Sequence, residues 1–359
     1  MVILAGGGTG GHVYPALAMG DALRASGHTV AYYGDGARLE GRVAPQRGYA
    51  FRPVDGTPFP RRGIVARLRF AFSLLKATLA ARRLLQKDGA TLVLGVGGYV
   101  MAPTVLAAWT LRLPAVIHES NVSPGLANRL CARVSRLVLL TYDATRKRLG
   151  GGAEMLTVGC PVNPRILEGS AEKYGLPEGR RVLLVVGGSL GSATINEVAL
   201  AAAVDPSRDY AILHLTGPRY FEEVQAAYDA LPAVARRDVV VRGYEDQMGD
   251  AFAAADLVLA RAGSSTLAEL CAVGMPSVLV PSPNVTDNHQ EANARGLEAA
   301  GAAKVFVERG LVAAQVAAQL GAILADETQL SGMSSSALAL GRRGVAESIA
   351  ALILERVPG

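Results

Sequence analysis

A glycine-rich run near the start of the chain ends in a histidine. Gly6-Gly7-Gly8-Thr9-Gly10-Gly11-His12 follows the apolar residues 2–5 and precedes a helical pattern. Glycines at such a junction leave the backbone N–H groups of the first helical turn open to a ligand, and the helix dipole adds partial positive charge there. The imidazole of His12 titrates near neutral pH. The run therefore predicts an anion-binding loop with a group that can accept a proton.

A second glycine loop lies about half the chain further on. Gly187-Gly188-Ser189-Leu190-Gly191-Ser192 follows the apolar residues 182–186 and precedes a helical pattern over residues 193–203. Two such units in a chain of 359 residues predict two strand–loop–helix domains built alike. We expect a cleft between them in which two ligands meet.

Polar residues also follow other apolar runs. Gly97-Gly98-Tyr99 and His118-Glu119-Ser120-Asn121 come directly after predicted strands. Open α/β sheets bind ligands at the carboxyl ends of their strands, so both clusters are candidate ligand contacts. A histidine after an apolar strand is also a common core residue, which is the alternative for His118 and for His214.

The second half holds a turn rich in hydroxyl groups and a cluster of amides. Ser264-Ser265-Thr266 begins a helix, where hydroxyl groups either cap the helix or bind a phosphate. Glu269 lies one turn further on, so it either meets the ribose of a bound nucleotide or closes a capping box. Asn288-His289-Gln290 and Asn293 supply amides that donate and accept, which suits sugar hydroxyls.

The elements that position these groups alternate between strand and helix. The predicted strands cover residues 2–5, 29–33, 91–94, 115–118 and 137–140, then 182–186, 210–215, 239–241, 257–260 and 277–280. This alternation is typical of parallel sheets in an α/β fold. Two prolines between residues 157 and 167 mark a junction, so we predict domains over residues 1–160 and 161–334. We expect the terminal helix, residues 335–359, to pack back on the first domain.

Composition limits the classes of protein. A chain that is 50% hydrophobic and 19% charged is globular. Its three cysteines form no C-x-x-C, and no cluster has metal-ligand spacing, so we expect no metal and a reducing compartment. The start lacks the pattern of a signal peptide, which favours the cytoplasm. Residues 89–111 carry no charge, but glycines and Pro103 interrupt them, which predicts a strand, a loop and a helix rather than a membrane span.

Positive charge is concentrated in one segment, which begins at Arg61 and ends at Lys87. It holds eight Lys or Arg residues and no Asp or Glu, whereas the net charge of the chain is +5. Apolar residues recur in it at helical spacing. The segment is either a helix packed on the core with solvated arginines or a basic amphipathic helix on an anionic membrane surface. The absence of a known binding motif weighs against a nucleic-acid partner.

The first glycine loop has a further interpretation. Gly6-x-Gly8-x-x-Gly11 matches the dinucleotide fingerprint, and Asp35 lies near the end of the second predicted strand, where an acidic ribose ligand is expected. This pattern alone leaves a nicotinamide-dependent oxidoreductase open. Two features weigh against it: His12 and its neighbours enlarge the loop, and the second glycine loop stays unexplained.

Taken together and in order over residues 6–293, these motifs resemble the MurG family of N-acetylglucosaminyltransferases. The resemblance implies a GT-B architecture, with two doubly wound, Rossmann-like domains facing across a cleft, and inverting transfer without metal or cofactor. It implies UDP-N-acetylglucosamine as donor and lipid I, the undecaprenyl-diphosphate-linked N-acetylmuramyl pentapeptide, as acceptor, giving lipid II for peptidoglycan. It also implies a peripheral protein on the cytoplasmic face of the cell membrane, with the basic segment on anionic lipid. A UDP-sugar:diacylglycerol glycosyltransferase shares the architecture and is the nearer alternative.

The resemblance also assigns residues. It implies that His12 is the catalytic base, with Glu119 sharing or replacing that role. The donor-binding residues implied are Thr9, Gly10, Gly11, His12, Asn121, Ser189, Tyr244, Ser264, Ser265, Thr266, Glu269, Gln290 and Asn293. The acceptor-binding residues implied are Gly8, Thr9, Gly10, Tyr99, Asn121 and Asn128. Where the family has Gly-Asn-Pro-Val-Arg, this chain has Gly159-Cys160-Pro161-Val162-Asn163, and Arg165 stands two places on, so the family's arginine contact is not carried over to Arg165.

Overall fold

The computed structural model describes residues 1–60, 63–150, 152–285 and 288–357. The chain divides into two units. Unit 1 comprises Met1–Asn163 and Gly344–Gly359, and unit 2 comprises Pro164–Arg343. The second boundary expected from the sequence, after residue 334, falls inside helix α14 (Glu327–Leu340), which stays with unit 2 along its whole length.

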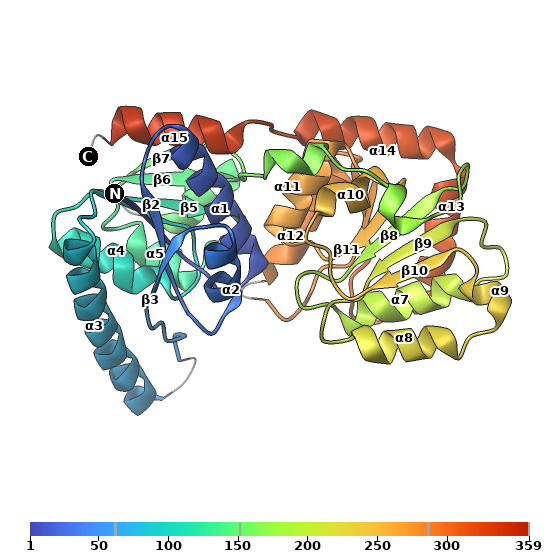
Figure 1. Ribbon diagram of the computed structural model, residues 1–359, viewed down its shortest axis with the longest axis horizontal. Helices are drawn as coiled ribbons and strands as arrows, with labels where there is room; N and C mark the ends of the chain where they lie inside the picture. The colour runs from blue at the N-terminus through green and yellow to red at the C-terminus, as the bar shows by residue number, and fades with distance from the viewer. Residues whose placement is uncertain (61–62, 151, 286–287, 358–359) are drawn as a thin grey trace. The chain divides into compact units, whose positions relative to one another are not determined.

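Unit 1 is built on a parallel sheet that has seven strands among the described residues, in the order β3-β2-β1-β4-β5-β6-β7 (Figure 1). The strands are β1 (Val2–Ala5), β2 (Val30–Gly34), β3 (Ala50–Pro53), β4 (Leu92–Gly95), β5 (Ala115–Glu119), β6 (Leu137–Leu140) and β7 (Glu154–Thr157). The helices are α1 (Gly10–Ala25), α2 (Leu39–Gln46), α3 (Ile64–Lys87), α4 (Met101–Thr110), α5 (Leu126–Cys131), α6 (Arg146–Leu149) and α15 (Val345–Arg356), with a 3-10 turn at Asp143–Thr145.

Both faces of this sheet are covered by helices. Side chains alternate along β1, so Val2 and Leu4 join a core with α1, α2 and α15, whereas Ile3 and Ala5 join a core with α3, α4 and α5. Burial on both faces explains why the central strands are continuous apolar runs. The terminal helix α15 packs against α1, and Arg356 pairs with Glu154 of β7 at 3.1 Å.

Unit 2 repeats the plan, with a six-stranded parallel sheet among its described residues in the order β10-β9-β8-β11-β12-β13 (Figure 1). The strands are β8 (Val182–Val186), β9 (Ala211–Leu215), β10 (Val239–Arg242), β11 (Leu257–Ala260), β12 (Ser277–Leu279) and β13 (Ala303–Val305). The helices are α7 (Ala193–Ala203), α8 (Phe221–Asp229), α9 (Ala233–Arg236), α10 (Met248–Ala253), α11 (Ser264–Val273), α12 (His289–Ala299), α13 (Ala313–Ala325) and α14, with 3-10 turns at Pro164–Leu167 and Glu172–Tyr174.

Both sheets are doubly wound, which confirms the predicted α/β fold class. In each sheet the strand order reverses beside the first strand, between β1 and β4 in unit 1 and between β8 and β11 in unit 2. Loops that leave neighbouring strands at such a switch point diverge to opposite faces of the sheet and open a crevice for a ligand. The two glycine loops both lie at a switch point, because one follows β1 and the other follows β8.

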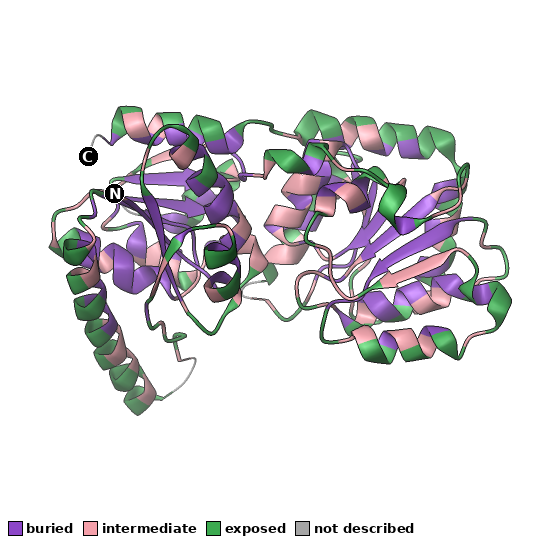
Figure 2. Cartoon of the chain, viewed as in Figure 1, coloured by how far each residue is buried: buried purple, intermediate pink, exposed green. Residues whose placement is uncertain are grey.

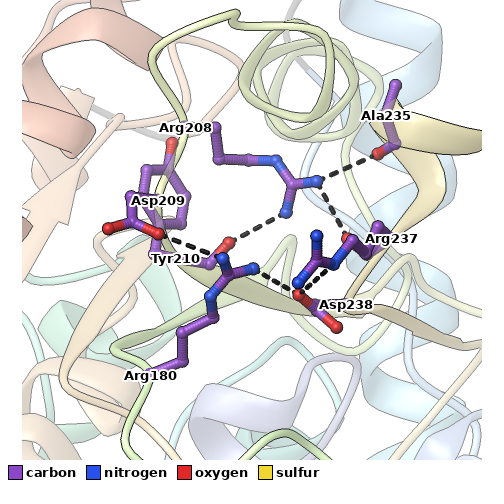
Figure 3. Close-up of polar contacts among 7 residues, drawn as sticks. All are labelled: Arg180, Arg208, Asp209, Tyr210, Ala235, Arg237 and Asp238. Atoms are coloured by element: carbon purple, nitrogen blue, oxygen red, sulfur yellow. Dashed lines mark hydrogen bonds and ion pairs between the residues drawn. The ribbon is translucent and has the colours of Figure 1, made fainter.

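At the amino-terminal ends of the strands in the second sheet, polar residues form a network of hydrogen bonds and ion pairs (Figure 3). Arg208 donates hydrogen bonds to three backbone carbonyl oxygens, those of Tyr210 (2.8 Å), Arg237 (2.8 Å) and Ala235 (3.3 Å). Arg180 pairs with Asp238 and, at 3.1 Å, with Asp209. Arg180 precedes β8, and the other residues of the network precede β9 and β10, so the network fixes the amino-terminal ends of these strands and leaves their carboxyl ends to the candidate site.

The basic helix α3 keeps most of its apolar side chains in solvent (Figure 2). Among its residues only Ala77, Thr78, Ala81 and Leu85 are buried. The exposed apolar residues are Ile64, Val65, Leu68, Phe72, Leu75 and Leu79. The alternative that these apolar positions pack on the core is therefore wrong. Arg61 and Arg62, at the start of the basic segment, lie outside the described residues.

The uncharged residues 89–111 form β4, a glycine turn and α4, as the sequence predicts. Val93 and Leu94 are fully buried in the sheet, and α4 packs one side on the core of unit 1. In the part of the chain that the structure describes, no helix combines the length and the hydropathy needed to cross a membrane.

Candidate functional site

The first glycine loop connects β1 to α1. The helix begins at Gly10 after Thr9, whose backbone is extended and whose carbonyl oxygen accepts from the N–H groups of His12 and Val13, both at 3.1 Å. Gly8 has a φ of +88°, which favours glycine. The N–H groups of Gly10 and Gly11 donate no hydrogen bond within the described residues. The loop thus offers the open helix start that an anion needs.

A neighbouring glycine turn packs directly against this loop. Gly7 donates its N–H to the carbonyl oxygen of Gly97 at 3.3 Å. A Cβ atom on Gly97 would lie 2.6 Å from Cδ2 of His12, and one on Gly98 would lie 2.3 Å from the carbonyl oxygen of Gly7. Only glycine therefore allows the two loops to approach this closely. The turn leads into Tyr99, which brings this predicted acceptor contact to the same edge of the sheet.

The Nδ1 atom of His12 faces two oxygen atoms of the glycine loop. Its Nδ1 atom lies 3.2 Å from the carbonyl oxygen of Gly7 and 3.2 Å from the hydroxyl oxygen of Thr9. A carbonyl oxygen only accepts, so the proton of a neutral ring is placed on Nδ1, and Nε2 keeps its lone pair. This arrangement is the one that a general base requires.

Glu119 ends β5 and is almost fully buried. Its two carboxylate oxygens accept four hydrogen bonds from the loop and helix that follow: from N and Nδ2 of Asn121 (2.8 and 3.2 Å), from N of Gly125 (3.2 Å) and, on α5, from Nδ2 of Asn128 (2.6 Å). Burial raises the pKa of Glu119 to about 7, although these hydrogen bonds oppose the shift. The carboxylate therefore ties the loop that carries the predicted ligand contact Asn121 to Asn128 on α5.

The neighbouring His118 is an interior residue. It is fully buried, and its Nε2 atom lies 2.9 Å from the carbonyl oxygen of Gly159. Burial lowers its pKa to about 4, so the ring stays neutral. His214 in unit 2 is likewise buried, between Asn196 (3.0 Å) and Tyr228 (3.1 Å). The core alternative holds for both histidines.

In unit 2 the second glycine loop connects β8 to α7. Ser192 caps α7 by accepting from the N–H of Ile195, which leaves Ser189, one turn earlier and half-buried, outside the cap. Gly191 passes so close to the next strand that its Cβ would lie 2.2 Å from the carbonyl oxygen of Thr216. Ser189 thus lies on a tightly packed loop at the carboxyl end of β8.

The hydroxyl-rich turn forms the start of α11. The residue before the helix is Gly263, which has no side chain with which to cap it, and Ser264, Ser265 and Thr266 occupy the first turn itself. Ser264 is buried and accepts a hydrogen bond from Nδ2 of Asn293 at 3.1 Å. This contact joins α11 to α12 and places Asn293 beside the helix start.

The Glu269 carboxylate lacks the hydrogen-bond donors and positively charged partners that a structural role would require among the described residues. No hydrogen bond or ion pair joins its carboxylate to another described residue, so it closes no capping box. Desolvation raises its pKa to about 7. Because a partly buried carboxylate without a partner costs stability, a ligand that donates to it is the natural explanation.

Glu308 connects the start of α7 to the segment just before α11. It accepts from Nη1 of Arg261, at the end of β11, at 2.5 Å and from Oγ1 of Thr194, on α7, at 2.6 Å. Arg261 also donates to the carbonyl oxygen of Val280 at 3.0 Å. These pairings hold the pKa of Glu308 below its usual range, although burial opposes the shift. No local sequence pattern marks Glu308, because its partners are far away in the chain.

The remaining predicted donor contacts follow two other strands of unit 2, β12 and β10. Gln290, on α12, accepts from the N–H of Ser282, which follows β12, at 2.9 Å. Tyr244 follows β10 and is half-buried, and Glu245 beside it accepts from Tyr174 at 2.7 Å and Lys173 at 3.0 Å. Arg165 is exposed in the turn Pro164–Leu167. No cluster of possible metal ligands occurs among the described residues.

Two family models cover most of the chain. The glycosyltransferase family 28 N-terminal domain matches residues 2–139, and the family 28 C-terminal domain matches residues 182–349. The chain belongs to glycosyltransferase family 28. The matches fall on unit 1 and unit 2 respectively, apart from the last six residues of the second match, and each contains one of the two glycine loops.

Two relatives that align over the whole of this chain have the same name. A protein of Acidithiobacillus ferrooxidans is 40% identical over 100% of this chain and 98% of its own length, and one of Halothermothrix orenii is 37% identical over 100% and 99%. Both are named UDP-N-acetylglucosamine–N-acetylmuramyl-(pentapeptide) pyrophosphoryl-undecaprenol N-acetylglucosamine transferase. The crystal structure of Acinetobacter baumannii MurG matches with a TM-score of 0.77 and 29% identity over 99% of both chains. The resemblance to MurG and the GT-B fold class are confirmed.

Proposed function

We propose that this chain transfers N-acetylglucosamine from UDP-N-acetylglucosamine to the N-acetylmuramyl group of pyrophosphoryl-undecaprenol-linked pentapeptide, turning lipid I into lipid II with inversion at the sugar. The observation that carries the proposal is identity of 40% over the whole chain with a relative named for this transfer. The chemistry of both glycine loops supports it, because donor and acceptor each contain a diphosphate.

Unit 2 is proposed to bind the donor. Its diphosphate is assigned to the starts of α7 and α11, next to Ser189 and residues 264–266. The unpartnered carboxylate of Glu269 accepts from the ribose hydroxyls. Tyr244, with Glu245 beside it, meets the uracil, and the amides of Gln290 and Asn293 contact the amino sugar, since amides donate to and accept from hydroxyl groups.

Unit 1 is proposed to bind the acceptor. Its diphosphate is assigned to the start of α1, at Thr9 and Gly10, with Tyr99, Asn121 and Asn128 along the same edge of the sheet. We assign the catalytic base to His12 rather than Glu119, because both oxygens of Glu119 are already engaged by the loop that it organises. Glu119 is instead a positioning residue.

The transfer is a displacement at the anomeric carbon. Nε2 of His12 accepts the proton of the acceptor's 4-hydroxyl while that oxygen forms a bond to the anomeric carbon. The bond from this carbon to the phosphate oxygen breaks on the opposite face, and UDP leaves with the electron pair. The positive helix starts in unit 2 stabilise the charge that develops on the leaving diphosphate.

A panel of donors and acceptors tests the proposed function. The purified protein is expected to release UDP from UDP-N-acetylglucosamine only when a short-chain lipid I analogue is present, and to discriminate by at least tenfold in kcat/KM against UDP-glucose and UDP-galactose. Transfer to diacylglycerol with either of those donors would instead support the nearer alternative. A fluorescence titration with NADH is expected to show no binding.

Two sets of contacts in unit 1 weigh against a nicotinamide-dependent oxidoreductase. In the first glycine loop, the N–H of Gly8 donates to the buried carboxylate of Glu40 at 3.0 Å. The Asp35 carboxylate, the expected ribose ligand, accepts from the N–H of Ala37 at 2.9 Å and pairs with Arg38 at 3.7 Å. The groups that a dinucleotide needs are thus engaged within the protein.

The lipid-linked acceptor suggests how the protein reaches its substrate. We propose that α3 rests on the anionic cytoplasmic surface of the membrane, which makes the protein peripheral. Phe72 is 72% exposed and Leu68 is 67% exposed, on a helix whose charged residues are all basic. Exposed apolar side chains among cations are typical of helices that lie in a lipid interface.

Replacing these apolar residues is expected to weaken vesicle binding. The double change Leu68→Ser and Phe72→Ser removes two side chains that are each worth about 1.5–3 kcal/mol when fully buried, so the affinity for vesicles of anionic phospholipid is expected to fall by at least about tenfold. Co-sedimentation measures it. The matched control is Val234→Ser in unit 2, which is 78% exposed and is expected to change nothing. Equal binding by the double variant would contradict the proposed surface.

A further inference from the structure

Glu40 is a fully buried carboxylate beneath the first glycine loop. It lies in the first turn of α2, and its exposed fraction is 0%. Oε2 accepts from the N–H of Gly8 at 3.0 Å, and Oε1 accepts from the N–H of Asp35 at 3.2 Å. Acceptance at both oxygens is the bonding pattern of a carboxylate. The proposed transfer does not use this side chain directly.

The Glu40 side chain packs tightly against two glycines, Gly7 and Gly34. A Cβ atom on Gly7 would lie 1.9 Å from Oε1 of Glu40, and one on Gly34 would lie 2.7 Å from its Cγ. The carboxylate therefore fills the space that two glycines leave open. Gly97 and Gly98 pack on the loop as well, so the loop is held between this carboxylate and the neighbouring turn.

One peptide group connects Glu40 to His12. The N–H of Gly8 and the carbonyl of Gly7 belong to the same trans peptide and point in opposite directions. Its N–H donates to the carboxylate of Glu40 at 3.0 Å, while its carbonyl oxygen lies 3.2 Å from Nδ1 of His12. The result is a continuous chain of carboxylate, peptide and imidazole.

We propose that Glu40 is a positioning residue for His12, acting through the Gly7–Gly8 peptide group, which its carboxylate both orients and polarises. An anion that accepts from the N–H end of a peptide increases the negative charge on the carbonyl oxygen at the other end. That oxygen then holds the proton on Nδ1 more strongly and favours the imidazolium that forms when Nε2 gains a proton. The coupling itself is independent of the reaction, but its catalytic meaning rests on the proposed role of His12 as base.

Other titratable groups also lie near the series of hydrogen bonds from Glu40 to His12. His118 interacts electrostatically with His12 and is neutral because burial lowers its pKa to about 4. The Tyr32 hydroxyl is buried near Glu40, and burial raises its pKa well above its usual value. Asp35 is paired with Arg38 at 3.7 Å. Glu40 differs from them in that the Gly7–Gly8 peptide joins it to His12 by two consecutive hydrogen bonds.

The variant Glu40→Gln tests the coupling, because it keeps the shape and removes the charge. The titration of the His12 ring, followed by NMR of its ring nitrogens and assigned with His12→Asn, is expected to move down by about one pH unit. The fraction of the ring with its proton on Nδ1 is expected to fall. In steady-state assays kcat is expected to fall by about tenfold with little change in the donor KM, and the acid limb of its pH profile moves down by the same amount.

The matched control is Asp256→Asn in unit 2. Asp256 also accepts from a backbone N–H, that of Val182 at 2.8 Å, and pairs with Arg181 at 2.6 Å, but it belongs to the other unit. Its loss is expected to change stability alone and to leave the His12 titration unmoved. The variant Glu40→Asp keeps the charge on a shorter stem, so its His12 titration is expected to lie between those of the wild type and Glu40→Gln.

The outcomes separate this proposal from the proposed function. An unmoved His12 titration in folded Glu40→Gln overturns the coupling, whatever the kinetics. If Glu40→Gln does not fold, the comparison of Glu40→Asp with the wild type decides, and an identical titration and kcat overturn the coupling. A shifted titration combined with full turnover in His12→Ala supports the coupling and overturns the role of His12 as base.

Discussion

Replacing His12 by alanine is expected to lower kcat by about 10²- to 10⁴-fold while the donor KM changes by less than about threefold. The reason is that Nδ1 of His12 lies 3.2 Å from the carbonyl oxygen of Gly7, which favours the tautomer with its proton on Nδ1 and gives Nε2 the role of proton acceptor in the proposed transfer. The resemblance also counts His12 among the donor contacts, but the diphosphate, ribose, uracil and amino sugar of the donor are assigned to unit 2, so loss of the ring is expected to cost little donor affinity. UDP release with saturating donor and a lipid I analogue measures kcat, and calorimetry measures donor affinity.

His28 supplies the control for this prediction. It lies just after the same helix, where its N–H donates to the carbonyl oxygen of Leu23 at 3.1 Å, and it takes no part in the glycine loop. His28→Ala is expected to keep the wild-type kcat. If His12→Ala also keeps it, the base is another group, and Glu119, with a pKa raised to about 7 by burial, becomes the first candidate.

The central strands could be predicted from sequence because they are buried on both faces. Strands β1, β6, β8 and β11 have the predicted bounds, and each is a continuous apolar run. The strands without a prediction, β3, β7 and β13, all lie at an edge of a sheet. An edge strand is covered on fewer sides, so it tolerates Arg52 and Pro53 in β3 and Glu154 in β7 and loses the apolar signal.

Glycine explains the largest shift in a helix boundary. The sequence predicts the first helix from about Pro15, whereas α1 begins at Gly10. Gly10 and Gly11 are weak helix formers, so local propensity places the start too late. In the fold, close packing between the loop and the turn at Gly97 outweighs that propensity. The residues that make the loop suited to a ligand are thus the ones that hide the start of the helix.

Candidate site residues that follow a strand could be placed from the sequence. Residues whose hydrogen-bond partners are distant in the sequence could not. His12, Glu119, Ser189 and Ser264 follow apolar runs, which places them at carboxyl ends of strands in a parallel sheet. Glu40 and Glu308 could not be found in this way. Their partners are separated from them by up to 114 residues, and α2, which carries Glu40, had no prediction at all. Long-range hydrogen bonds are set by tertiary packing, which no local pattern contains.

Donor affinity is expected to depend on pH through Glu269. Desolvation raises the pKa of this carboxyl group to about 7, and ribose hydroxyls donate to its ionised form. Protonation therefore competes with the donor below pH 7, so affinity is expected to rise about tenfold per unit as pH increases toward 7 and to level off near pH 8. Calorimetry with UDP-N-acetylglucosamine in buffers of different ionisation enthalpy measures both the affinity and the proton released on binding.

The variant Glu269→Gln separates this role from a structural one. A hydrogen bond to a charged group is worth about 1.5–3 kcal/mol, so the variant is expected to bind the donor about 10- to 100-fold more weakly at pH 8 and to lose the dependence on pH. The unfolded chain ionises this group near its ordinary pKa of 4.5, well below the folded value, so the folded state loses stability as pH rises from about 4.5 to 7. Removing the charge is therefore expected to raise the melting temperature by a few degrees at pH 8. Glu223→Gln, an exposed position on α8, is expected to change neither quantity. A donor affinity that is the same at pH 6 and pH 8, or the same in Glu269→Gln, would leave the unpartnered carboxylate without a role in donor binding.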